Sequence, residues 1–236
     1  MFQTELHKAM TAMGLELSDR QIQQFCLFQE LLLETNKVMN LTAITEPAEV
    51  AVKHMADSLS CYDAAYFTRG AQVLDLGTGA GFPGLPLLIY QPDLQVSFFD
   101  SLQKRLRFIQ EVLTQLGLQA SCLHGRAEEM AHQEAYRERF DIVTSRAVAR
   151  LPILAEWALP YVKKDGLFIS LKGAQYEEEI KESQHALQIL GAAVEEVRPV
   201  QLPGLNDKRA VIYIRKVTAS PKKYPRKPKM AAKNPL

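Results

Sequence analysis

The sequence predicts an α/β fold in which a mainly parallel sheet carries helices on both faces. From residue 73 onward, short apolar segments alternate with amphipathic ones, a pattern typical of strands joined by helices. Alternating glycines directly follow the first apolar segment, at a place where such folds bind ligands. The last two strand-like segments have no helix between them, so we expect them to form an antiparallel pair at one edge of the sheet.

The chain begins with residues 1–65, which we expect to form an N-terminal helical extension. Ser18 is suited to the N-cap of a helix in which Phe25, Phe28 and Leu32 recur at helical spacing. Such an apolar stripe is typical of a helix that packs against a core. The main domain is then expected to cover residues 66–217.

Seven segments of the main domain are strand-like. They are VLDL (73–76), VSFFD (96–100), ASCLHG (120–125), FDIVTS (140–145), GLFISLKG (166–173), AAVEEVRPV (192–200) and RAVIYIRK (209–216). Helices are expected over residues 104–118, 151–162 and 176–191, and Pro83 is suited to the first turn of another.

The composition is that of an ordinary globular protein. The chain has 236 residues, 47% of them hydrophobic, with 28 Lys and Arg against 27 Asp and Glu, which excludes collagen-like and wholly disordered classes. No segment approaches the roughly 20 apolar residues of a membrane span, and the start lacks a secretory pattern, so we expect a cytoplasmic protein without membrane contact. The three cysteines lack the spacing of a zinc site, and we expect no metal.

The charge is unevenly distributed along the chain. From residue 215 to the end there are eight Lys or Arg and no acid, whereas residues 1–214 carry 20 basic and 27 acidic groups, a net charge of −7. The last 17 residues include four prolines and few apolar side chains, so we expect residues 218–236 to be a disordered basic tail. Such a tail suits a polyanionic partner, although many basic tails only add solubility.

The most informative segment is VLDLGTGAGFPG, residues 73–84. Gly77, Gly79 and Gly81 alternate there, which exceeds what one tight turn requires. A loop of this kind lets a ligand approach bare backbone at the N-terminus of a helix.

Two classes of ligand fit this loop. Gly79, Gly81 and Gly84 satisfy the G-x-G-x-x-G pattern of dinucleotide sites, with Asp100 about 20 residues on for the ribose. For S-adenosylmethionine, Asp75 in the strand before the loop is placed to interact with the cationic methionine end, while Asp100 accepts from both ribose hydroxyls. A dehydrogenase normally has a second domain for its substrate, and none is evident here, so the layout favours a methyltransferase.

Several motifs together resemble one family. They are NLTAIT (40–45), KHMADSL (53–59), VLDLGTGAGFPGLPL (73–87), FFDSLQKRLRFI (98–109), GRAEE (125–129), FDIVTSRAVARL (140–151), LKG (171–173) and KRAVIYI (208–214). This combination resembles the bacterial 16S rRNA guanine-N7 methyltransferases, historically called glucose-inhibited division protein B. The resemblance runs from about residue 36 to residue 215, and it implies a Rossmann-like seven-stranded methyltransferase sheet, S-adenosyl-L-methionine as the cofactor and ribosomal RNA of the small subunit as the substrate.

The resemblance also implies site residues. Positions that match the family's cofactor site are Gly77, Phe82, Asp100, Ala127, Glu128 and Arg146, to which the loop argument adds Asp75 and Gly79. Arg146 is the expected catalytic residue, because a guanidinium stacks on a purine and donates in a fixed fork. Candidate phosphate contacts are Lys104, Arg105, Lys172, Lys208 and Arg209. The roles of Asn40, Thr42, His54 and Asp57 stay open, and Glu128 is equally suited to the first turn of a helix.

The expected reaction asks little acid–base chemistry of the protein. The N7 atom of guanine carries an in-plane lone pair, so methyl transfer needs alignment and exclusion of water rather than a general base. We expect a monomer that acts on 16S rRNA or on the small subunit, and the sequence leaves open which of the two. An NAD-dependent oxidoreductase and a noncatalytic RNA-binding protein with the same fold stay as alternatives.

Overall fold

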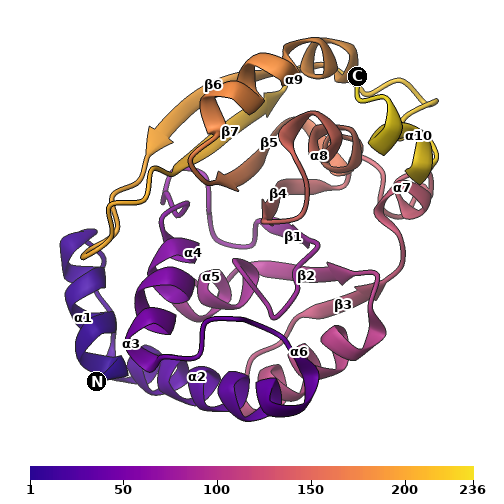
Figure 1. Cartoon of the computed structure of the whole chain (residues 1–236). Helices are drawn as coiled ribbons and strands as arrows, with labels where there is room; N and C mark the ends of the chain where they lie inside the picture. Colours follow the sequence, from indigo (N-terminus) through magenta and orange to yellow (C-terminus); the bar gives the residue numbers. More distant parts are fainter.

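The computed structural model of the protein describes residues 1–236, apart from the side chains of residues 228 and 229. Its centre is a seven-stranded sheet (Figure 1). The strands are β1 (Gln72–Leu76), β2 (Gln95–Asp100), β3 (Ser121–His124), β4 (Phe140–Arg146), β5 (Val162–Lys172), β6 (Ala192–Pro199) and β7 (Ala210–Lys216). Each overlaps a predicted strand, which confirms the α/β prediction.

The strand order places a crevice near the centre of the sheet. The order is β3-β2-β1-β4-β5-β7-β6, with β1 to β5 parallel and β7 antiparallel to both of its neighbours. The predicted antiparallel pair is confirmed, with β6 outermost. The chain runs outward from β1 to β3 and then returns to β4 on the other side of β1. Ligands of such sheets bind beyond the carboxyl ends of the strands at this change of direction.

Helices cover both faces of the sheet. On one face and beside it lie α1 (Phe2–Ala12), α2 (Asp19–Met39), α3 (Pro47–Val50), the π-helical η1 (Ala51–Ala56), α4 (Asp57–Leu59), α5 (Gly84–Tyr90) and α6 (Gln103–Leu116). On the other lie α7 (Ala127–Met130), α8 (Leu151–Ala158), the 3-10 turn η2 (Leu159–Tyr161) and α9 (Tyr176–Leu190), with α10 (Pro228–Lys233) against α8. Among the described residues, no helix combines the length and the apolar character that crossing a membrane requires.

The N-terminal helices pack onto the sheet through one continuous core. Phe25 and Leu32 of α2 belong to the same buried cluster as Leu106 and Ile109 of α6. Ser18 is the N-cap of α2, as predicted, and it forms a reciprocal capping box with Gln21. The helices of residues 2–59 fall within the predicted extension, and the boundary at residue 65 stays a prediction.

Two boundaries differ from the prediction. The helix expected over residues 151–162 ends at Ala158, η2 follows, and β5 begins at Val162. Pro160 lacks an N–H and its ring clashes with the preceding turn, which explains the early end. Pro83 is the N-cap residue of α5 rather than a residue of its first turn.

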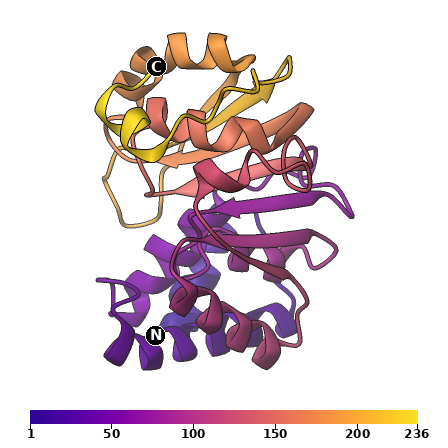
Figure 2. The same ribbon diagram turned by 90° about the vertical axis from the view of Figure 1, so that its right-hand side faces the viewer.

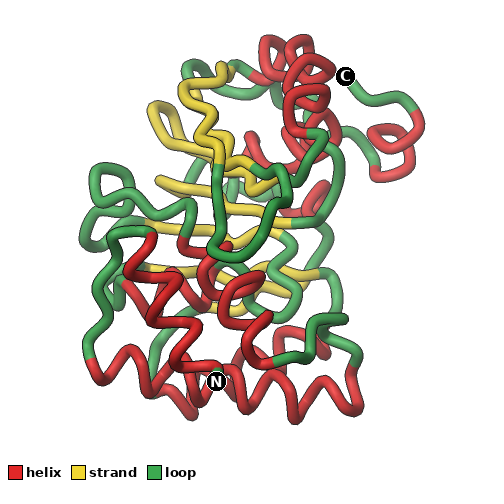
Figure 3. The backbone as a smooth tube through the Cα atoms, turned by 60° about the vertical axis from the view of Figure 1, so that its left-hand side comes forward, coloured by secondary structure: helices red, strands yellow, loops and turns green.

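The prediction of a disordered tail is wrong for the segment that follows β7. Ser220 and Tyr224 are buried, and Arg226 forms an ion pair with the fully buried Glu156. The tail lies beside α7 and α8, at the end of the molecule opposite the N-terminal helices (Figure 2, Figure 3). Composition averaged over the tail missed these few anchoring side chains, which supply specific buried contacts between exposed lysines.

Candidate functional site

The glycine loop leaves β1 in a backbone conformation that favours glycine. Gly77 has φ +71° and Gly79 has φ +60°, both in the left-handed region. A Cβ atom on Gly77 would lie 2.5 Å from Cγ2 of Val148, which belongs to the loop after β4. The two loops are therefore in direct contact, and Gly77 permits that contact.

Asp75, in β1, supports the glycine loop through hydrogen bonds to its residues. Its side chain is fully buried and accepts hydrogen bonds from Thr78 Oγ1 at 2.6 Å, the Gly84 amide at 3.0 Å and Thr144 Oγ1 at 3.3 Å. Burial raises the pKa of this carboxyl to about 6, although the donors act in the opposite direction. The carboxylate faces these donors and lines neither cavity described below, and its contact with the cofactor's methionine end stays a prediction.

The first cavity lies beyond the carboxyl ends of β1 and β2, and we call it the β2 cavity. Its volume is about 290 Å³. Its walls include Gly77, Asp100, Arg105, Ala127, Glu128 and Trp157. Four of these six are residues that the sequence analysis proposed for the cofactor, Arg105 was proposed for RNA phosphates, and Trp157 is new.

Asp100 is the acid of the β2 cavity. Only 3% of the residue is exposed, and each carboxylate oxygen accepts from one backbone amide: Oδ1 from Leu102 at 2.8 Å and Oδ2 from Gly79 at 3.0 Å. Arg105, which is partly exposed, adds a longer contact of 3.3 Å to Oδ2. Since a carboxylate oxygen has two lone pairs, each oxygen keeps capacity for a ligand hydroxyl once Arg105 moves away.

The opposite wall of the β2 cavity is formed by α7 and α8. Ala127 and Glu128 are the first residues of α7, so the structural and the functional interpretations of Glu128 both fit. The hydroxyl of Tyr161, just after α8, donates to the Ala127 carbonyl at 2.6 Å and ties the two elements together. Trp157 projects from the last turn of α8, and its buried Nε1 has no hydrogen-bond partner among the described side chains.

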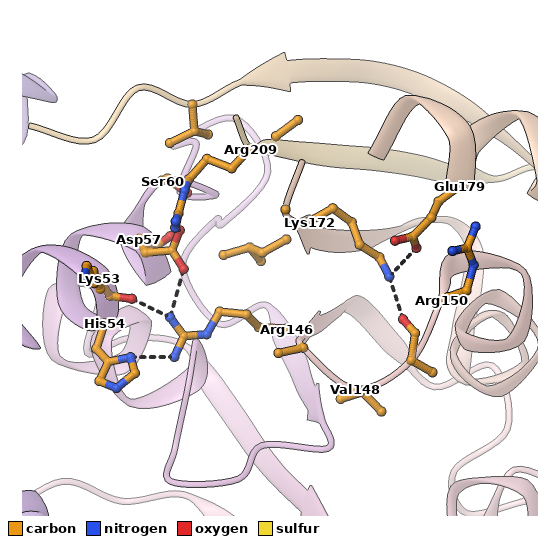
Figure 4. Close-up of a pocket in the computed structure, with 16 residues that line it drawn as sticks. Lys53, His54, Asp57, Ser60, Arg146, Val148, Arg150, Lys172, Glu179 and Arg209 are labelled. Atoms are coloured by element: carbon orange, nitrogen blue, oxygen red, sulfur yellow. Dashed lines mark hydrogen bonds and ion pairs between the residues drawn. The ribbon is translucent and has the colours of Figure 1, made fainter. Parts of the chain in front are cut away.

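The second cavity is larger, about 550 Å³, and we call it the Arg146 cavity (Figure 4). Arg146 ends β4, and its guanidinium donates to Asp57 Oδ2 at 2.9 Å, to the Lys53 carbonyl at 3.2 Å and to His54 Nδ1 at 3.2 Å. The same guanidinium lies 4.7 Å from the centre of the Phe82 ring. Phe82 thus supports Arg146 and lines neither cavity, and Arg146 lines only this second one.

Cationic side chains outnumber acidic ones in the walls of the Arg146 cavity, although Lys53 and Arg150 also pair with Glu49 and Glu182 outside it. Lys53, Arg146, Arg150, Lys172 and Arg209 line it, against the two carboxylates of Asp57 and Glu179. Asp57 lies between two arginines, because Arg209 also donates to it at 2.6 Å. The buried Nε of Arg209 has no partner within the described part of the chain. This surplus of cationic donors suits an anionic ligand or one rich in acceptors.

His54 is held neutral in this cluster. Arginine cannot accept a hydrogen bond, so His54 Nδ1 must be the acceptor toward Arg146, which leaves the proton on Nε2 for Thr42 Oγ1 at 2.7 Å. The ring also stacks on Phe82 with centroids 4.5 Å apart. Burial and the Arg146 charge lower the pKa of His54 from 6.5 to about 4.

The lowered pKa of His54 predicts a pH-dependent stability. As the pH falls below 6.5, the unfolded chain takes up a proton at His54 before the folded chain does, so the free energy of unfolding falls. Between pH 7.5 and pH 5 this loss amounts to about 2 kcal/mol. Urea unfolding across this range is expected to show about 2 kcal/mol less destabilisation by acid for His54→Gln than for the natural chain, while the opposite contribution of the buried Asp75 stays the same in both. The control variant His185→Gln, at an exposed position, should keep the pH dependence of the natural chain. The same change in both variants would contradict the assignment of this dependence to His54.

The structure separates the predicted phosphate contacts. Lys172 and Arg209 line the Arg146 cavity, and Arg105 lines the β2 cavity. Lys104 and Lys208 are exposed outside both cavities, and Lys208 pairs with Glu177. Lys172 is buried and donates to the Ala149 carbonyl and to Glu179, so it fixes the loop after β4.

Some roles that the sequence left open now have a place. Asn40 is the left-handed C-cap of α2, a structural position, whereas Thr42, His54 and Asp57 converge on Arg146. The sequence analysis missed Lys53, Val148, Trp157 and Glu179. The spacing of His54 and Asp57 on one helical turn was a usable signal, but nothing local marked the others. Among the described residues, no group of three or more His, Cys, Asp or Glu side chains is arranged to hold a metal ion.

The chain resembles one family over most of its length. The model of the family described as rRNA small subunit methyltransferase G matches residues 21–210. The "Ribosomal RNA small subunit methyltransferase G" of Desulforamulus reducens is 46% identical over 98% of this chain and 97% of that protein. The protein of the same name from Lachnoclostridium phytofermentans is 48% identical over 97% of this chain and 95% of its own length.

Solved structures share the fold at low sequence identity. TrmN from Thermus thermophilus superposes with a TM-score of 0.52 at 22% identity, over 69% of this chain and 48% of that one. TYW2 from Pyrococcus horikoshii, solved in complex with MeSAdo, gives a TM-score of 0.54 at 14% identity over 69% of this chain and 62% of that one. These similarities support the Rossmann-like methyltransferase sheet, and together with the relatives they do not favour the oxidoreductase alternative.

Proposed function

The chain belongs to the rRNA small subunit methyltransferase G family and is accordingly an S-adenosylmethionine-dependent rRNA methyltransferase, and we propose that it methylates the N7 atom of a guanine in 16S rRNA. One observation carries the assignment of the site. The β2 cavity and the cationic Arg146 cavity share Ala147 and Val148 in their walls, so two ligands would meet across this loop.

The β2 cavity fits S-adenosylmethionine. The oxygens of Asp100 are fixed by two backbone amides, and each can accept from one ribose hydroxyl once Arg105 moves away from Oδ2. Ala127, Glu128 and the indole ring of Trp157 line the part of the cavity that is suited to the adenine. Gly77 and Gly79 keep the loop backbone close to the ligand, and Asp75 acts indirectly by bracing that loop. When bound, S-adenosylmethionine supplies an electrophilic methyl group on its sulfonium.

The Arg146 cavity is the proposed place for the target nucleotide. A guanine offers acceptors at O6 and N7, and the planar forks of Arg146 and Arg209 are suited to stacking on the base or to donating to O6. Lys53 and Arg150 at the cavity wall are suited to its phosphates. A base inside a duplex cannot enter such a cavity, so the target must be unstacked or lie in an open loop.

The chain's own contribution is alignment in a water-poor site. Guanine N7 attacks with a lone pair that carries no proton, so no residue needs to remove one at this step. The neutral His54 agrees with this, because it is occupied by Arg146 and Thr42 and acts as a support. Arg146, held by Asp57, His54 and the Lys53 carbonyl, fixes the base, and this positioning reduces the entropic part of the barrier.

Residues outside the two cavities suggest how the enzyme contacts its RNA and in which oligomeric state it acts. We infer that the exposed Lys104 and Lys208 contact RNA phosphates outside the cavities. We also infer that the protein works as a monomer in the cytoplasm, on naked 16S rRNA or on the assembled small subunit. Residues 1–65, which provide His54 and Asp57, would then complete the site of the domain at 66–217 rather than form a separate unit.

Transfer of a labelled methyl group tests the proposed function. The substrates are 16S rRNA, 30S subunits and 70S ribosomes from cells that lack the protein, and reductive strand cleavage at N7-methylated guanine locates the label. We expect one label per 16S rRNA, on a guanine N7. Label on another atom would refute the proposed chemistry. Binding of S-adenosylmethionine without transfer to any of the three substrates would support a noncatalytic RNA-binding protein, and tighter binding of NAD would support an oxidoreductase.

A further inference from the structure

The segment after β7, residues 217–234, lies outside the residues that the family model matches, and we call it the C-terminal strap. It starts against the end of α9, where the Ser220 hydroxyl donates to the Leu190 carbonyl at 3.0 Å. The fully buried Lys216 ammonium donates to Ser220 Oγ and, at 2.8 Å, to the Leu159 carbonyl in η2. The strap is thereby anchored beside the turn that follows α8.

Arg137 joins the strap to the segment that follows α7. Its guanidinium donates to the carbonyls of Ser220 at 2.9 Å and Tyr224 at 3.0 Å, and also to that of Ala131 at 3.1 Å. His132 adds a contact of 2.9 Å to the Pro225 carbonyl. These carbonyls are fixed by side chains from the immediate continuation of α7, the helix that begins with Ala127 and Glu128.

Arg226 joins the strap to α8. Its side chain donates from Nε at 2.9 Å and from Nη2 at 2.7 Å to the two oxygens of Glu156, and its backbone amide donates to the same carboxylate at 2.6 Å. Glu156 is fully buried, and Arg226 is its ion-pair partner. Glu156 lies next to Trp157, the α8 residue that lines the β2 cavity.

These contacts hold together the two elements that form the adenine end of the β2 cavity. Arg226 lines neither of the two cavities, but it fixes the last turn of α8 directly before Trp157. Side chains behind a binding wall set its geometry, and a loose support costs affinity even when the wall residues are intact.

We propose that Arg226 is a positioning residue for S-adenosylmethionine: through Glu156 it holds Trp157 in place, so that the indole ring forms the wall against which the adenine packs. The proposal rests on the proposed function, because it assigns S-adenosylmethionine to the β2 cavity. It makes the strap, outside the residues matched by the family model, a part of the cofactor site.

The test compares Arg226→Ala with Arg226→Lys and with Arg215→Ala. Arg215 is the control, because it also pairs with a carboxylate, Glu195, but it lines neither cavity and lies on β7 opposite Leu167, away from the carboxyl ends of the parallel strands. Calorimetry with S-adenosylmethionine is expected to give a dissociation constant raised about tenfold for Arg226→Ala, a partial rescue by lysine, and a value within twofold of the natural one for Arg215→Ala. The KM for the cofactor should rise by the same factor while kcat at saturating cofactor stays within twofold.

A second measurement separates positioning from mere stability. Trp157 is the chain's single tryptophan, so its fluorescence reports on this wall alone. We expect a shifted emission in Arg226→Ala before cofactor is added. Trp157→Ala should weaken binding about tenfold in the natural chain and less than threefold in the Arg226→Ala background, because the ring is already displaced there.

The outcomes are distinct for the proposal and for the proposed function. If the natural chain does not bind S-adenosylmethionine, the proposed function fails. If the natural chain binds it and Arg226→Ala binds equally well, or if the two substitutions weaken binding independently, the positioning role is refuted. If Arg215→Ala weakens binding as much as Arg226→Ala, the effect is one of general stability and the role is refuted as well.

Discussion

Asp100→Ala is expected to weaken the binding of S-adenosylmethionine by about 10²- to 10⁴-fold. Two ribose hydroxyls would lose a charged acceptor, and a hydrogen bond to a charged group contributes about 1.5 to 3 kcal/mol. The amides of Gly79 and Leu102 would lose their common partner as well, so the loop would also lose its pre-formed shape. Titration calorimetry measures the dissociation constant directly.

The control for this prediction is Asp141→Ala. Asp141 also accepts from a backbone amide, that of Gln72 at 2.8 Å, but it lies at the amino end of β4, at the far edge of the sheet from the cavities. We expect the Asp141→Ala variant to bind the cofactor with unchanged affinity. If Asp100→Ala is folded, as cooperative unfolding would show, and its dissociation constant is unchanged, Asp100 is not part of the cofactor site.

Arg146→Ala is expected to lower kcat/KM for the RNA about 100- to 1000-fold while cofactor affinity changes less than threefold. A misplaced reacting group costs about 10²-fold, and a lost preorganised donor costs about 10²- to 10³-fold. The fold should survive, because Asp57 keeps Arg209 as a partner at 2.6 Å. Single-turnover methyl transfer with saturating cofactor measures the effect.

Two further variants sharpen this prediction. Arg146→Lys keeps the charge but lacks the planar fork, so it should recover less than a tenth of the lost activity. Arg150→Ala removes another cation of the same cavity, one that is 44% exposed and paired with Glu182, and should cost less than tenfold. If Arg146→Ala instead abolished cofactor binding, the arginine would belong to the cofactor site, as the family resemblance implied, and its placement in the second cavity alone would be wrong.

Much of the fold was predictable because the periodicity of apolar residues and the glycines and prolines that end strands and helices are local properties of the sequence. Glycines stop β1, Gly117 ends α6 in the left-handed conformation, and the missing helix before β7 predicted its antiparallel pairing. Asp100 was predictable for the same reason. It ends a strand adjacent to the glycine loop, and parallel strands present their carboxyl ends at one edge.

Contacts between distant segments were not predictable from local pattern. Asp75 has the correct position in the strand, but the orientation of its carboxylate is decided by Thr78, Gly84 and Thr144. Likewise, Arg146 was expected near the cofactor, yet His54 and Asp57, about 90 residues earlier, draw it toward the second cavity. The composition of the tail gave no indication that Arg226 pairs with the buried carboxylate of Glu156, 70 residues earlier in the chain.

The loop between the two cavities has a consequence for how their ligands affect each other. Val148 belongs to the walls of both cavities and lies against Gly77, so the same loop separates the two cavities. A ligand that shifts this loop from within one cavity changes the free energy of binding in the other cavity. By thermodynamic linkage, the cofactor must then alter the affinity for the nucleotide by the same factor by which the nucleotide alters the affinity for the cofactor.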